Sequence, residues 1–170
     1  MAIAGVVSAS ILDRTRHGNE QLASLDSDPA LTTQTSRLLA RYLMSDDPSF
    51  EMLMTEARAI VGGGAEEALL KHLDKAYLED EKYTPDRSHC LKGKLLSQRG
   101  EYQQAAEEFK LALRTNPANH DARKSLTLLY FSAGSYDLAE EQVEEALKYE
   151  TDEGQVGFYQ TLLQKIHQPA

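Results

Sequence analysis

His89 and Cys90 are the only adjacent pair of soft metal ligands in the sequence, so metal chemistry would have to start there. Two neighbours on a helix point about 100° apart, and both cannot bind one ion without further ligands. None of the spacings of a zinc site joins the other histidines, which are His17, His72, His120 and His167. The pair is therefore predicted to be structural, and neither a metal nor another cofactor is expected.

Two other features could support phosphate binding or catalysis. The glycine run at 62–64 precedes an expected helix, where backbone amides can hold a phosphate, but the lysine and serine of a P-loop do not follow it. No serine stands in a nucleophile elbow. Acidic pairs recur at a spacing that places them along one solvated side of a helix: Glu140, Glu141, Glu144 and Glu145. We therefore predict a turn at the glycines and a protein that is not an enzyme.

The composition is that of an acidic globular chain. With 170 residues, 41% of them apolar, it has the length of one domain and enough apolar residues for a continuous core. A formal net charge of −9 disfavours general binding to nucleic acid or to an anionic membrane surface. A single cysteine excludes an internal disulfide. The segment 1–12 is apolar but lacks the basic start of a secretory signal, and no stretch approaches a membrane span, so we expect a soluble cytoplasmic protein.

Turn, aromatic and small residues recur along the sequence at one fixed interval. We call it the repeat interval, and it equals the distance along the chain from Gly100 to Gly134. The other matching pairs are Tyr102 and Tyr136, Ala105 and Ala139, Phe109 and Val143, Ala112 and Ala146, and Leu113 and Leu147. This interval is one of the known solenoid periods. The order of glycine, aromatic residue, alanine and large apolar residue predicts a helix, a tight turn and a second helix. The alanines should lie where the two helices approach most closely.

This pattern resembles the tetratricopeptide repeat family. The unit 86–119 has the small residue of the family's first helix at Gly93, the turn at Gly100, the packing pair at Ala105 and Phe109, the second alanine at Ala112 and the terminating proline at Pro117. Two residues of this unit depart from the family: His89 takes the place of an early tryptophan, as a partly buried ring, and Leu96 that of a tyrosine. In the unit that follows, Tyr130 restores the tyrosine, while Thr127 replaces the glycine and Thr151 the proline.

The resemblance implies an all-α fold, a right-handed solenoid of helix-turn-helix repeats with capping helices at its N-terminal and C-terminal ends. A helical domain at 31–170 is expected after a flexible polar leader at 1–30, with repeats at about 50–83, 86–119 and 120–153 and a capping helix at 154–168. The first repeat is degraded, with its turn at Gly64 and its buried positions at Leu53, Ala57, Ile60, Leu69, Leu73 and Ala76. The expected helices are 33–44, 50–61, 65–80, one begun by Thr84 and Pro85, 102–115, 120–133, 136–149 and a last one opened by Thr151.

In the family, fixed positions on the first helix of each repeat line a concave groove, and the resemblance therefore implies where a partner would bind. Carried over to this chain, the expected contacts are Met54, Arg58, Arg87, Cys90, Lys94, Gln98, Lys124, Leu128 and Phe131. Four of these side chains are basic in a chain that is strongly acidic overall. This predicts a mildly positive groove that attracts acidic residues and a few large apolar ones.

The resemblance implies a non-catalytic protein–protein interaction module that grips an extended or a helical segment of another protein. Two alternatives stay open, a small secretion-type chaperone for a client protein and a structural adaptor subunit of a larger assembly. In size, acidity and repeat number the chain is similar to small bacterial chaperones of type III secretion, a likeness of architecture alone. No nucleic acid and no membrane insertion are expected, and the sequence leaves open whether the chain forms a homo-oligomer.

Overall fold

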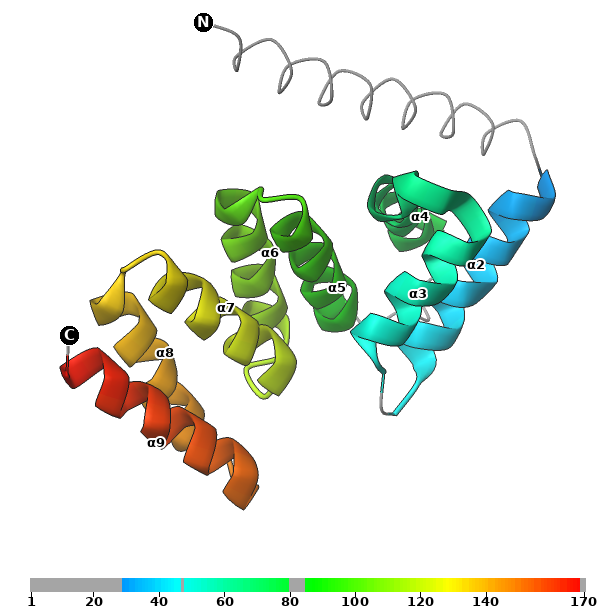
Figure 1. Cartoon of the computed structure of the whole chain (residues 1–170). Helices are drawn as coiled ribbons and strands as arrows, with labels where there is room; N and C mark the ends of the chain where they lie inside the picture. Colours follow the sequence, from blue (N-terminus) through cyan, green and yellow to red (C-terminus); the bar gives the residue numbers. More distant parts are fainter. Residues whose placement is uncertain (1–28, 47, 80–84, 169–170) are drawn as a thin grey trace, which may run out of the picture. The chain divides into compact units, whose positions relative to one another are not determined.

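The computed structural model describes residues 29–46, 48–79 and 85–168, and in these ranges it contains helices and no strands (Figure 1), which confirms the all-α prediction. The helices are α2 (Pro29–Met44), α3 (Phe50–Val61), α4 (Ala65–Glu79), α5 (Pro85–Gln98), α6 (Tyr102–Thr115), α7 (His120–Ser132), α8 (Tyr136–Leu147) and α9 (Glu153–His167). The chain divides into two compact units, Met1–Tyr83 and Thr84–Ala170, and each is described by itself. One continuous domain over 31–170 stays a prediction.

The first unit begins with a helix that is longer than predicted. α2 starts at Pro29 rather than near residue 33, because the fixed φ and missing N–H of proline suit the first position of a helix. The last two residues of the predicted leader are therefore helical, while residues 1–28 lie outside the described ones, as does Thr84, the predicted cap of α5. Between α3 and α4, the glycines of the 3₁₀ turn η1 (Gly62–Gly64) confirm the predicted turn.

The core of the first unit lies where α2, α3 and α4 meet. Its buried apolar side chains come from all three helices and include Leu38, Leu39, Leu43, Leu53, Met54, Ala57, Leu69 and Leu73. Burial is thereby confirmed for four of the positions predicted from the degraded repeat, namely Leu53, Ala57, Leu69 and Leu73. Ile60 is only half-buried, and the side chain of Ala76 is outside the described part.

The second unit consists of two helix pairs, α5 with α6 and α7 with α8, followed by α9. Gly100 and Gly134 turn the chain within the two pairs at φ values of 80° and 72°, a region that glycine enters without the penalty of a side chain. Within the first pair, a Cβ atom added to Gly93 would lie 2.6 Å from the ring of Phe109. Glycine is therefore what allows this ring to close over α5.

Polar side chains hold the junctions between successive repeats. Asp86, at the start of α5, is buried and accepts hydrogen bonds of 2.9 Å from Nδ2 of both Asn116 and Asn119, which lie between α6 and α7. His120 takes the equivalent place one repeat interval later, and its Nδ1 lies 2.8 Å from Oε2 of Glu150. The two junctions therefore use different chemistry to fasten the following loop to the first helix of the repeat.

α9 begins two residues later than the predicted opening at Thr151. Its cap is Asp152, whose carboxylate accepts a 2.9 Å hydrogen bond from the backbone N–H of Gln155. Aspartate is a somewhat better helix cap than threonine, because its carboxylate also interacts favourably with the helix dipole. The acids at this end of the helix are therefore placed as the dipole requires.

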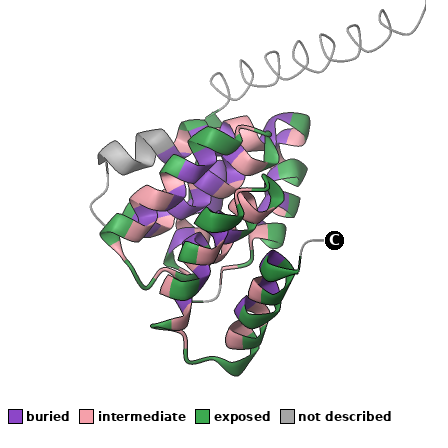
Figure 2. Cartoon of the chain, turned by 90° about the vertical axis from the view of Figure 1, so that its left-hand side faces the viewer, coloured by how far each residue is buried: buried purple, intermediate pink, exposed green. Residues whose placement is uncertain are grey.

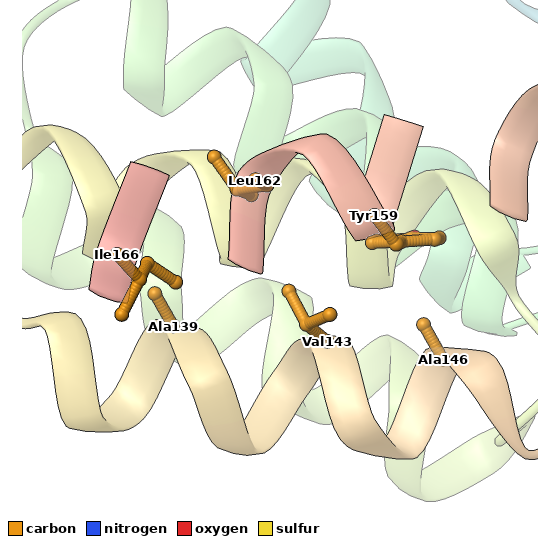
Figure 3. Close-up of a cluster of buried hydrophobic side chains, with 6 residues drawn as sticks. All are labelled: Ala139, Val143, Ala146, Tyr159, Leu162 and Ile166. Carbon is orange, nitrogen blue, oxygen red and sulfur yellow. The ribbon is translucent and has the colours of Figure 1, made fainter. Parts of the chain in front are cut away.

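α8 and α9 pack through a layer of small and large side chains (Figure 3). The layer contains Ala139, Val143 and Ala146 from α8, and Tyr159, Leu162 and Ile166 from α9. The alanines let the two helices approach, and the larger side chains of α9 fill the space above them. Buried residues gather in this way where helices pack, and exposed residues lie on their outer sides (Figure 2). The predicted burial of Ala105 and Ala139 is confirmed.

Ala139→Leu is expected to destabilise the protein by about 1–3 kcal/mol, because the added atoms enter a layer that is already filled. Glu141→Ala is a suitable control, since Glu141 is exposed on the same helix and its loss should change stability by less than about 0.5 kcal/mol. Urea unfolding followed by circular dichroism measures both variants. Equal midpoints would contradict the packing between α8 and α9.

Candidate functional site

The first helices of the second unit bring together most of the side chains predicted to contact a partner. α5 and α7 contact each other. Together they supply six of these side chains, which we call the first-helix surface: Arg87, Lys94 and Gln98 from α5, and Lys124, Leu128 and Phe131 from α7. The surface therefore combines basic and apolar groups from helices that stand one repeat apart.

Lys94 forms an ion pair across the two helices. Its Nζ lies 2.6 Å from Oδ2 of Asp121, at the start of α7. The lysine side chain is 16% exposed and that of the aspartate 59%, so solvent reaches the pair mainly at the aspartate. Because the carboxylate balances its charge, Lys94 makes the surface less positive than the sequence predicts.

Lys124 contacts an aromatic ring and an amide group, and it has no carboxylate partner among the described residues. Its Nζ lies 4.8 Å from the centre of the Phe158 ring and 3.5 Å from Oε1 of Gln155, both on α9. A ring face attracts the ammonium group, and an amide oxygen binds it, but neither neutralises it. Sequence reasoning missed Phe158 and Gln155. They stand one repeat interval after Lys124 and Asp121, so continuing the interval into α9 would have found them.

The apolar part of the surface lies further along α7. Leu128 is 39% exposed, and Phe131 is half-buried. The Phe131 ring meets that of Tyr136, at the start of α8, with centroids 5.6 Å apart and planes at 61°, an edge-to-face contact. Tyr136 is itself 45% exposed and extends the apolar patch. It is missing from the predicted site, although the Gly134 turn between the two rings indicates that they are close.

Two predicted contacts need correction. Met54 is 1% exposed and Cys90 is 5% exposed, so neither side chain can reach a partner. Both occupy a helix position that neighbouring helices cover. Burial of their apolar surface there is favourable, because it removes that surface from water. Burial raises the pKa of the Cys90 thiol from 9.0 to about 12, against a smaller opposing effect of Lys94. A thiol protonated at neutral pH is a poor nucleophile.

The remaining candidates have local partners. Arg58, in the first unit, donates from Nη2 to Oε1 of Glu66 at 2.8 Å. His89 is half-buried, and its Nδ1 lies 2.7 Å from Oε2 of Glu108, which fits its predicted structural role. In the described part of the chain, no three metal-ligating side chains come together. None of the helices described there combines the length and apolarity that a bilayer crossing needs.

Helix pairs that recur at the repeat interval, with a mixed basic and apolar surface on their first helices, define a helical repeat protein. Residues 96–166 match the model of the tetratricopeptide repeat family. This stretch is therefore a tetratricopeptide repeat segment, which confirms the predicted resemblance, and it includes α9 up to Ile166. Such repeats generally mediate protein–protein interactions. A comparison with curated proteins returned no match.

Proposed function

We propose that the second unit is a non-catalytic interaction module that binds a segment of another protein on the first-helix surface. The observation that carries this proposal is the arrangement on α7. There the charge of Lys124 is not balanced by a described carboxylate, and Leu128 and Phe131 follow it on the same side of the helix. The general role of tetratricopeptide repeats in protein–protein interaction supports it.

The partner segment that suits this surface is acidic and carries one or two large apolar side chains. Lys124 supplies positive charge, and Leu128 and Phe131 supply apolar area. α8, in contrast, contains five acidic residues and no lysine or arginine. Repulsion from such surfaces would steer an acidic segment toward the first-helix surface. An extended and a helical segment both satisfy these requirements.

Leu128→Ala is expected to weaken partner binding by about 1–2 kcal/mol, mainly through faster dissociation, because it removes apolar contact beside the charge. Leu138→Ala is the matched control, since Leu138 is 44% exposed on α8 where Leu128 is 39% exposed on α7. Lys124→Glu should slow association, whereas Arg114→Glu, on exposed α6 surface, should have little effect.

The partner for this test is obtained by affinity purification and mass spectrometry, and its affinity for each variant is measured with folding checked by circular dichroism. If Leu128→Ala and Lys124→Glu both bind as the wild type does, the partner uses another surface. Fixed stoichiometry with several stable proteins would then favour the adaptor subunit. A single partner that becomes insoluble without this chain would favour the chaperone.

A further inference from the structure

One side of α9 is uncovered among the described residues. A pocket of ≈ 290 Å³ runs along it, lined by Gly154, Gly157, Phe158, Thr161, Leu162 and Lys165. These residues recur every three or four positions and so share one side of the helix. A Cβ atom added to Gly157 would meet no atom within 4 Å. The pocket is therefore an open helix face with room for close approach.

The equivalent face is covered in the two preceding first helices. Thr161 stands one repeat interval after Thr127 and two intervals after Gly93. Thr127 is 0% exposed, and Gly93 lies against the Phe109 ring of the second helix α6. Thr161 is exposed. α9 thus has the register of a first helix, and no described helix takes the second place beside it.

We propose that a second copy of this chain covers this face, with its α9 packed antiparallel to the first. In that arrangement two pairs of accessible pocket residues meet, Gly154 with Lys165 and Thr161 with Phe158, and Gly157 lies over Leu162, which is itself buried against α8. Each pair joins a small side chain to a longer one, so the helices can approach without leaving gaps. A parallel arrangement would oppose Phe158 to Phe158 and Gly157 to Gly157. The antiparallel one is also closed, because each copy presents the same surface.

Charge supports the same orientation. Glu153 stands at the first position of α9, and Lys165 lies in its last turn. Neither forms a salt bridge within the described residues. Antiparallel packing places Glu153 of each copy beside Lys165 of the other, so the pair forms twice. One helix from each copy makes a small interface, and the dimer is expected to dissociate on dilution. This inference does not depend on the proposed partner surface.

Sedimentation equilibrium of the full chain, from about 1 µM to about 1 mM, tests the dimer. The wild-type mass should rise from one copy to two, and Gly157→Arg should weaken association by about tenfold or more, because the long side chain occupies the contact. The free chain has room for this arginine, and arginine favours a helix more than glycine does. Gln103→Arg, on the exposed side of α6, is the matched control and should dimerise normally.

A charge exchange tests the orientation. Lys165→Glu and Glu153→Lys should each weaken self-association by roughly tenfold, because each change creates two like-charge contacts in the dimer. An equimolar mixture of these two variants should recover wild-type affinity, since both contacts become complementary again. A mixture that associates no better than either variant overturns the proposal. A wild-type chain that stays monomeric would also overturn it, and so would a dimer whose affinity Gly157→Arg does not change. In either case the open face of α9 would be available to another protein.

Discussion

Gly93→Thr is expected to destabilise the protein by about 1–3 kcal/mol. The reason is steric: even a bare Cβ at this position would lie 2.6 Å from the Phe109 ring, closer than real Cβ atoms come to any neighbour. The ring is 1% exposed and is enclosed between α5 and α6, so it cannot swing into solvent. The backbone of the helix pair has to open instead.

A second change should relieve this strain. Phe109→Val alone is expected to cost roughly 2–4 kcal/mol, because it leaves a cavity in a closed core. Together, the two changes recreate the residues found one repeat interval later, Thr127 and Val143, both of which are 0% exposed. The double variant should therefore cost about 0.5–3 kcal/mol less than the sum of the single variants.

Urea unfolding of the four proteins gives the coupling energy directly. Gly157→Thr controls for the change in helix preference when threonine replaces glycine, because its side chain would enter open space. This control should differ little from the wild type at concentrations where the chain is monomeric. Additive effects of Gly93→Thr and Phe109→Val would show that these two residues do not pack against each other.

Stability is expected to fall as pH rises above about 9, at up to about 1.4 kcal/mol per pH unit for each group that ionises on unfolding. Burial raises the pKa of Cys90 from 9.0 to about 12, so the unfolded chain loses this proton first. Between these two values the folded state binds more protons than the unfolded state, and stability is lost with rising pH. Burial, aided by the carboxylate of Glu150, also raises the pKa of Tyr159 from 10.0 to about 12, which adds to the loss above pH 10.

The order of these two pKa values separates the contributions. Cys90→Ala should reduce stability at pH 7 through a small cavity, but it should flatten the decline between pH 9 and 10. Tyr159→Phe should flatten only the part above pH 10, and Tyr149→Phe, at a tyrosine that is 57% exposed, is its control. Urea unfolding at steps of half a pH unit measures the slopes. An unchanged slope in Cys90→Ala from pH 9 to 10 would show that the thiol does not ionise on unfolding there.

The helices of the second unit are well predicted because their signals are local. Gly100 and Gly134 mark the turns, since each requires a positive φ. Alanines at one repeat interval mark the closest approach of paired helices, and both kinds of signal can be read without knowing the fold. Helix ends are less certain by a few residues, as Pro29 and Asp152 illustrate, because several nearby residues can begin a helix.

The all-α class and the repeat register can be predicted from the amino-acid sequence, because turn residues, caps and helical spacing act within a few positions of the chain. Which members of that register are exposed depends on tertiary packing. Met54, Cys90 and Lys124 hold the same position in their repeats, yet the first two are buried and Lys124 is paired with an aromatic ring of α9. Burial of a helical side chain depends on the helices that pack on either side of it, and the spacing within its own helix does not contain that information.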